Sequence, residues 1–403
     1  MKFRYSTKWG VFSLLAVIAF VPAFAQTFSS GSTGADGALN LSTPGTVVFD
    51  PKTFTPPLDP DGDGIYNFTT ITIGAGVTVR LRGDVIAAPV VWLAQGAVQI
   101  AGTIDASGQD GFSAGNTTQR TNTIPGAGGY PGGYPGVGAN LPGAGLGPAG
   151  GGACPPANVP VPFARPGGFT GNQFAVPLIG GSGGGGYAFL AGGAGGGALL
   201  IASSVSISGS GSIKANGGAN VNLSGNALSG LGAGGSIRLV APSFSLTGNL
   251  NAAAGAGGFN STCGPSAGTT SGVIRVEAFQ IGPINATGTL YTATPFGLFL
   301  SPAGIPSLRV VSVGGIPVAT SPTGTFTIPD VTVNSNLPLP VVIAATNVTV
   351  GTIVTLTIFS ENGPDLTIQS TPLAGALAAS TATANVTLPP GFSKGFVKAT
   401  FIQ

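Results

Sequence analysis

A short acidic loop holds the residues best suited to site chemistry. Asp59, Asp61 and Asp63 stand at alternate positions and are followed by a glycine. Carboxylate oxygens at this spacing, followed by a backbone carbonyl, are the ligands that Ca²⁺ prefers, and they match the first half of a calcium-binding loop. The Ile65 carbonyl and Asn67, directly or through its water, would extend the set. The loop predicts Ca²⁺ as a cofactor; the alternative is a plain Asp-Gly turn that enters the first strand.

The second half of that loop departs from the pattern. Its twelfth position is Thr70 instead of a bidentate glutamate, and no flanking helix is expected. One ligand fewer lowers the affinity. Such a site would fill only where calcium is plentiful, as it is outside cells.

Histidine is absent from the 403 residues. Its absence excludes Ser-His-Asp and Cys-His catalysis, histidine-ligated metals and the usual general base near neutral pH. Acids are scarce too, since Glu277 is the only one between Asp110 and Asp330. A spatial cluster of Asp84, Asp105 and Asp110 would favour an enzyme, whereas a flat outer face would favour adhesion. The composition leans against catalysis without deciding the matter.

A second candidate site depends on a repeated motif. The segments 90–108, 199–217, 237–255 and 274–288 each hold an apolar strand, a short link and the pattern φ-x-φ-x-Gly-x-φ-x-Ala-x-Gly, where φ is apolar. Equivalent places fall at 98–100, 205–207, 244–246 and 279–281, and again at 104–106, 213–215, 250–252 and 284–286. Repeats of this kind indicate stacked units that bury a face only against their neighbours. They predict a parallel β-helix; a sandwich of antiparallel hairpins is the alternative.

Stacking in this register would place polar side chains in two outward columns. The column on the first strand of each repeat would hold Trp92, Leu200, Arg238 and Arg275. The column on the last strand would hold Asp105, Lys214, Asn251 and Asn285. A row of aromatic and planar hydrogen-bonding groups suits an extended sugar chain. The alternative is ordinary solvent-facing residues.

A long glycine-rich insertion, 109–197, separates the first two repeats, and shorter glycine runs precede the third and fourth. We expect these loops to leave the β-helix at one corner. We also expect part of the insertion to pack on its flank through aromatic side chains: Tyr130, Tyr134, Phe163, Phe169, Phe174 and Phe189. Cys154 and Cys263 lie in such loops, and a disulfide between them is expected in an exported protein. Two unpaired thiols are the alternative.

The N-terminus has the features of an export signal. A basic start is followed by an apolar stretch at 11–21 and by Ala23-Phe-Ala25, a small-x-small cleavage pattern. Residues 1–25 are therefore predicted as a signal peptide. A single membrane anchor is the alternative, although the apolar run is short of the roughly 20 residues that a span needs. Without this segment 11 basic residues face 12 acidic ones, so the mature chain gives no reason to expect nucleic acid as a partner.

The remaining chain divides by composition. Residues 26–64 form a turn-rich lead-in, 65–290 the β-helix and 291–306 a linker. Residues 307–403 alternate Val and Thr, with about seven short strands expected at 308–313, 324–328, 341–346, 353–359, 366–370, 381–388 and 395–401. This number of strands in about a hundred residues is typical of an immunoglobulin-like β-sandwich. The fold class predicted is all-β throughout.

Three stretches carry a family resemblance: 74–79 (Gly-Ala-Gly-Val-Thr-Val), 100–108 (Ile-Ala-Gly-Thr-Ile-Asp-Ala-Ser-Gly) and 234–241 (Gly-Gly-Ser-Ile-Arg-Leu-Val-Ala). They resemble glycine-rich exported bacterial proteins of the parallel β-helix, or pectin-lyase-like, type, over about residues 65–288. The tail resembles a bacterial immunoglobulin-like module. The resemblance implies a surface or matrix protein, since many members look like one, although others cleave polysaccharides.

These observations support three hypotheses about function. The first is an exported, non-catalytic cell-surface or extracellular-matrix protein that adheres to or structures extracellular polysaccharide. The second is a polysaccharide lyase or glycoside hydrolase on a β-helix scaffold. The third is a purely structural envelope component without a defined ligand.

Overall fold

The computed structural model describes residues 27–60, 64–114, 121–136, 141–153, 165–223, 227–257, 270–295, 297–298, 306–319, 322, 329–360, 366–388 and 395–400. Over these residues the chain is all-β, apart from one turn of 3₁₀ helix at Pro51–Thr53. Parallel sheets form the first part and antiparallel sheets the last.

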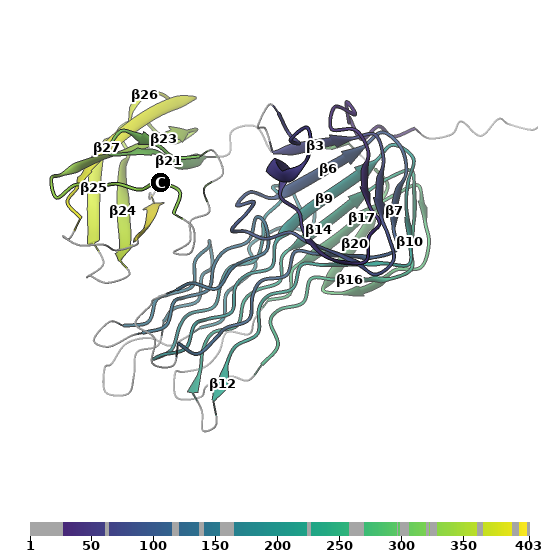
Figure 1. Cartoon of the computed structure of the whole chain (residues 1–403), viewed down its shortest axis with the longest axis horizontal. Coiled ribbons are helices and arrows are strands. Elements are labelled where there is room, and N and C mark those ends of the chain that lie inside the picture. Colours follow the sequence, from purple (N-terminus) through teal and green to yellow (C-terminus); the bar gives the residue numbers. More distant parts are fainter. Residues whose placement is uncertain are drawn as a thin grey trace, which may run out of the picture.

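The first part is a parallel β-helix of three six-stranded sheets (Figure 1). Sheet 1 holds β1 (Leu39–Leu41), β4 (Ile71–Ile73), β7 (Val98–Ile100), β10 (Ser206–Gly209), β15 (Ser243–Leu246) and β18 (Gln280–Ile281). Sheet 2 holds β2 (Gly45–Val48), β5 (Val77–Arg80), β8 (Thr103–Asp105), β11 (Ser212–Lys214), β16 (Asn249–Asn251) and β19 (Asn285–Thr287). Sheet 3 holds β3 (Ile65–Phe68), β6 (Val90–Ala94), β9 (Ala198–Ser203), β14 (Ser236–Val240), β17 (Val273–Glu277) and β20 (Thr289–Ala293). One strand from each sheet makes a coil, so the predicted solenoid is confirmed with six coils.

The coils extend beyond the four repeats at both ends. Strands β1 and β2 pair with β4 and β5, so the first coil begins inside the expected lead-in. At the other end β20 pairs with β17 and runs three residues into the expected linker. The repeats miss β1 to β5 at the start and β20 at the end, because these strands lie outside the four segments that carry the motif.

The register agrees with the predicted equivalences in some places and differs by two residues in others. Ile213 pairs with Ile104 and with Leu250, as expected. Ile207, however, pairs with Val98 where Ile100 was expected, and Ala286 replaces Ile284 opposite Leu250. A slip of two residues keeps every side chain on the same face of the strand. The apolar pattern therefore cannot detect it.

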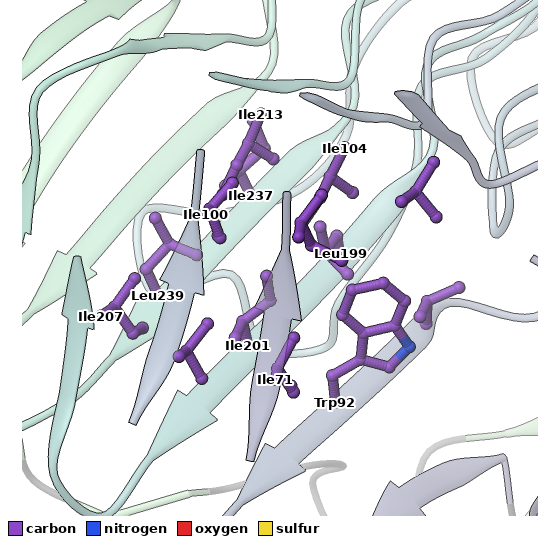
Figure 2. Packing of buried hydrophobic residues seen from close by; sticks show 14 of the residues in the cluster. Ile71, Trp92, Ile100, Ile104, Leu199, Ile201, Ile207, Ile213, Ile237 and Leu239 are labelled. Carbon is purple, nitrogen blue, oxygen red and sulfur yellow. The ribbon is translucent and has the colours of Figure 1, made fainter. Parts of the chain in front are cut away.

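The core of the β-helix is a column of aliphatic side chains that point inward from all three sheets (Figure 2). Small alanines at equivalent positions of the repeats are expected at a narrow inward corner, and Ala106, Ala215 and Ala252 are fully buried there, whereas Ala286, in the last coil, is exposed. Sheet 3 is buried on both faces along β9, β14 and β17. A smaller apolar cluster on its outer face includes Leu93, Leu200, Ala202 and Val240.

The glycine-rich segments form a bundle of extended runs that projects from one side of the β-helix (Figure 1). We call this the glycine bundle; it comprises residues 106–114, 121–134, 142–152, 165–169, 180–197, 215–220, 229–235 and 252–257. These runs connect strands of sheet 2 to strands of sheet 3, so the loops leave at a single corner, as expected. A short hairpin, β12 (Asn222–Leu223) and β13 (Ala227–Leu228), lies at the far end of the bundle.

Backbone hydrogen bonds between runs hold the bundle together. Run 180–187 donates at every third residue to one neighbour: Gly181 to Gly196, Gly184 to Gly193 and Tyr187 to Leu190. The intervening residues donate to two other runs: Ser182 to Gly168, Gly185 to Arg165, Gly183 to Leu146 and Gly186 to Gly143. A repeat of three residues is that of the polyproline II helix, which makes no hydrogen bonds within itself. Here adjacent runs satisfy those backbone groups.

Glycine is required in the bundle because the runs approach backbone to backbone. A Cβ on Gly195 would lie 1.7 Å from the Gly181 carbonyl oxygen, and a Cβ on Gly183 would lie 2.0 Å from that of Pro131. The expected packing through aromatic side chains is only partly seen, since Tyr134 is buried but Phe174 and Phe189 are 46% and 44% exposed. Phe163 lies outside the described residues. Backbone contacts, more than aromatic anchors, order the insertion.

The C-terminal part is a β-sandwich of two antiparallel sheets. One sheet has the order β22 (Ile316–Pro317), β21 (Ser307–Val313), β23 (Leu339–Thr346), β27 (Ala379–Val386) and β26 (Ala374–Ala376). The other has the order β25 (Leu366–Pro372), β24 (Ile353–Ser360) and β28 (Gly395–Thr400). Buried aliphatic residues such as Ile343 and Leu356 fill the space between them. Six of the seven expected strands are present, and the expected strand 324–328 lies outside the described residues.

Candidate functional site

The outer face of sheet 2 carries a polar column in strict register, which we call the sheet 2 ladder: Arg80, Asp105, Lys214, Asn251 and Thr287. Asp105, Lys214 and Asn251 occupy the positions that the repeats predicted. Arg80 extends the column by one coil, which the sequence interpretation missed because the fifth strand lies outside the four repeats. Asn285 was expected here but pairs with Asn249, two residues away, and Thr287 takes its place.

Ion pairing within the sheet 2 ladder leaves one cation without an opposite charge. Arg80 Nη1 lies 2.5 Å from Asp105 Oδ2, and Asp105 Oδ1 also accepts the Ser107 amide at 2.9 Å. Asn251 accepts the Ala253 amide at 3.1 Å. Among the described residues Lys214 has no ion-pair partner, and its side chain is partly exposed. The column therefore offers an ammonium group between the Asp105 carboxylate, which is paired with Arg80, and the Asn251 amide.

The expected column on sheet 3 is not an outer polar surface. Trp92 pairs with Ile201 instead of Leu200, so its side chain points into the core, where it is fully buried (Figure 2). Its ring packs against Phe49, with the ring centroids 5.0 Å apart. The prediction was wrong because β6 is apolar at every position, and periodicity cannot assign faces in such a run.

Arg238 and Arg275 do share a column on sheet 3, but both are buried. Glu277, which the sequence interpretation did not place in a site, lies between them. Its Oε1 accepts the Arg238 Nε at 3.0 Å and the Arg275 Nε at 2.7 Å. We call these three residues the charged triad.

The charged triad fastens two remote segments onto the outer face of sheet 3. Arg275 Nη1 donates to the Gln173 carbonyl at 3.1 Å, and its guanidinium lies 5.3 Å from the centre of the Phe174 ring. Arg238 Nη2 donates to the Gly297 carbonyl at 3.3 Å. Since these side chains serve the scaffold, they are not available to a ligand on the outer surface.

The acidic loop is described at its ends; Asp61 and Asp63 lie outside the described residues. Asp59 has a positive φ of 54°, and its Oδ2 accepts the Gly64 amide at 3.1 Å. Gly64, at the sixth position, has φ +80°. A glycine at this position is what a calcium loop needs for its sharp turn.

A further carboxylate, Asp36, joins this loop from the lead-in. Its Oδ1 accepts the Asp59 amide at 2.8 Å and its Oδ2 accepts the Asn67 amide at 2.5 Å. Asn67 uses its own side chain to bond the Ile65 carbonyl at 3.4 Å and the Thr33 amide at 3.2 Å. No local pattern links Asp36 to the loop, because the contact depends on how the first coil closes.

Carboxylates also surround a buried tyrosine beside the loop. Burial is the main cause that raises the pKa of Tyr66, and the negative charges of Asp59, Asp36 and Asp50 raise it further. Three carboxylates therefore act on this ring together, and carboxylate oxygens are ligands that Ca²⁺ prefers.

The three acids that would favour an enzyme each have a structural partner. Asp84 forms two bonds to Arg82, at 2.8 and 2.5 Å, and is buried. Asp105 pairs with Arg80, and Asp110 accepts the Ala219 amide at 2.7 Å. Among the described residues no group of three or more Asp, Glu, Cys or His side chains is arranged to hold a metal ion.

Two other expectations concern cysteines and membranes. Cys154 and Cys263 both lie outside the described residues, so their predicted disulfide stays a prediction. Within the part of the chain that the structure describes, no helix has the length and apolar character needed to cross a bilayer.

Comparison with known proteins gives no relative: no family model, no curated protein and no solved structure matches the chain.

Proposed function

We propose that the protein is an exported, non-catalytic component of a bacterial cell surface or extracellular matrix that adheres to polysaccharide. The sheet 2 ladder is the observation that carries this proposal. It is a regular column of hydrogen-bonding side chains along one sheet, and its middle holds the partly exposed Lys214. An extended sugar chain lying along the column would meet a donor or acceptor at each coil, about every 4.8 Å.

The remaining charges support a scaffold more than a reaction centre. The described acids near the β-helix corners hold backbone amides or arginines, and the charged triad fastens loops. The glycine bundle adds a projecting element made almost entirely of backbone. Its run from Ala106 to Ala114 spans roughly 25 Å at about 3.1 Å per residue. We take the C-terminal sandwich to be an immunoglobulin-like spacer, which fits the same role.

The test is a binding assay on the chain from Gln26 onward against a panel of bacterial and plant polysaccharides. We expect retention of at least one polymer without the appearance of new chain ends. Lys214→Ala should weaken that retention about tenfold or more, because a charge-assisted hydrogen bond is lost. Gln99→Ala is the matched control, since Gln99 is exposed on the outer face of sheet 1. Cleavage of any polymer, or equal retention of both variants, would overturn the proposal.

Calcium is the proposed cofactor, held by Asp59, Asp61, Asp63 and the Ile65 carbonyl, with Asp36 holding the loop in shape. The described end of the loop fits, because Gly64 already makes the turn and closes on Asp59. Ca²⁺ at 100 times its dissociation constant would raise the unfolding free energy by about 2.7 kcal/mol. Thermal unfolding with and without Ca²⁺ measures this effect, and Asp59→Asn should abolish it while Asp330→Asn, on an exposed residue of the C-terminal part, should not. An unchanged melting temperature across millimolar Ca²⁺ would refute the site.

A further inference from the structure

The two ends of the β-helix are built differently. At the first coil, Phe49 is fully buried and packs against Phe54 and Tyr66, with centroid distances of 5.6 and 5.2 Å. The segment before β1 covers the edge of β3, where the Asp36 amide donates to the Asn67 carbonyl at 2.9 Å and the Thr69 amide donates to Gly37 at 2.7 Å. This end therefore has a cap of aromatic rings and a covered strand edge.

Among the described residues no such cap covers the last coil. Strands β18, β19 and β20 stand last in their sheets, and none of the described strands pairs with their outer edges. Ile281 and Leu290 occupy inward register positions, opposite the buried Phe244 and Ile274, yet they are 39% and 37% exposed. In the part of the chain that the structure describes, the end of the hydrophobic core is thus open, beside three strand edges that no described strand pairs.

The chain that follows does not cover this end where it is described. After β20 it turns onto the outer face of sheet 3, where Leu298 packs against the apolar cluster of that face. There Arg238 holds the Gly297 carbonyl. The charged triad thus directs the start of the linker to the side of the β-helix.

The open end also lacks the features that keep exposed strand edges apart. Lysines, other charges and prolines are the usual protection. Residues 278–293 contain no charged side chain and a single proline, Pro283, between two strands. Two such ends can meet without electrostatic repulsion.

We infer that the last coil, formed by β18, β19 and β20, is the interface of a homodimer in which two β-helices join end to end. The occupant is a second copy of the same surface, because the cap on the first coil leaves no matching edge on sheet 3 for a head-to-tail stack. A twofold axis brings β20 of each copy together as an antiparallel pair and buries Ile281 and Leu290 across the contact. Twofold contacts of this self-complementary kind are the commonest in soluble oligomers. This inference stands apart from the proposed binding of polysaccharide.

The mass of the purified chain, measured by light scattering or sedimentation over a range of concentrations, tests the inference. We expect twice the chain mass for the unaltered protein. Leu290→Lys places two like charges at the twofold contact and should weaken the dimer at least about 100-fold. Ile316→Lys, on the sandwich, is the matched control because Ile316 is 41% exposed and should leave the dimer intact.

Hydrogen exchange keeps the test decisive if Leu290→Lys fails to fold. In the unaltered protein the outer amides of β18–β20 should be protected at high concentration and exchange fast on dilution. A monomer at every concentration, or a dimer that Leu290→Lys leaves unchanged, would overturn the inference. So would protection that does not depend on concentration, which would show that the chain covers its own end.

Discussion

Glu277 is a carboxylate between two guanidinium groups, and all three side chains are buried. Removing its charge takes away the anion that both Nε groups bond. Loss of one member of a buried ion pair costs about 3–5 kcal/mol. We therefore expect Glu277→Gln to lower the unfolding free energy of the β-helix by about that amount, measured by denaturant unfolding.

A second variant separates charge from shape in the charged triad. Replacing all three members together, by Arg238→Met, Arg275→Met and Glu277→Leu, removes the charges with similar volume. Such replacements of buried ion pairs are often neutral or stabilising. The triple variant should be more stable than Glu277→Gln. If the two are equally destabilised, the triad acts through its shape and its carbonyl contacts.

Tyr66 makes the free energy of unfolding depend on pH. Burial first, and then the nearby aspartates, raise its pKa in the folded protein above the ordinary value of 10.0. A group with a raised folded pKa stabilises the protein fully below its unfolded pKa, and that contribution is lost as the pH rises through the folded pKa. Between about pH 10 and 11 the unaltered protein should lose up to about 1.4 kcal/mol per pH unit relative to Tyr66→Phe. A difference between the two that stays constant across this range would contradict the argument.

At the scale of elements, the glycine bundle is the part of the fold expected to tolerate substitution least. Gly195→Ala would force a methyl group against the Gly181 carbonyl, which lies in a run held on several sides. We expect a loss of about 1–3 kcal/mol or more, as for other overpacked interiors, seen as a lower melting temperature and faster proteolysis of the insertion. Gly282→Ala is the control, because its Cβ would lie at an ordinary 3.4 Å from the nearest atom. Equal effects of the two would mean that the bundle is not closely packed.

The Val/Thr alternation of residues 307–403 predicted most strands of the sandwich, and the repeats predicted the parallel sheets and the corner from which the loops leave. They could not fix the register to better than two residues, because a slip of two preserves the alternation that they report. They also placed Trp92 on the surface, since a run that is apolar throughout has no readable period. Local sequence patterns could not predict that the insertion forms an ordered structure. Its three-residue hydrogen-bond repeat joins runs far apart in sequence, and glycine has no side chain whose polarity could indicate which face is buried.

The candidate site was predictable only where its residues fall within the repeats. Asp105, Lys214 and Asn251 did so. Arg80 lies outside the repeats, and Thr287, although inside the fourth repeat, takes the place of Asn285 through a slip of two residues. The roles of Glu277 and Asp36 could not be predicted from local sequence, because their partners are brought to them only when the coils fold. Asp36 is the only charged residue in 27–49, and that isolation was its one available signal, whereas Glu277 follows Arg275 by two residues.

At the scale of the whole molecule, the β-helix and the sandwich have separate hydrophobic cores that share no residue. The β-helix gains its stability from contacts between neighbouring coils, as solenoids do. The sandwich closes its own core between two sheets. Each part should therefore unfold in its own cooperative transition, because few apolar contacts would couple them.

Paired truncations of buried isoleucines test this independence. Ile213→Ala, in the β-helix core, should lower one transition by about 2–5 kcal/mol, and Ile343→Ala, in the sandwich core, should lower the other by a similar amount. Calorimetry of both variants resolves which transition moves. If either substitution shifted both transitions together, the linker that Arg238 holds at Gly297 would be transmitting stability between the two parts. Glu277→Gln would then be expected to uncouple them, since it removes the carboxylate that holds Arg238 in place.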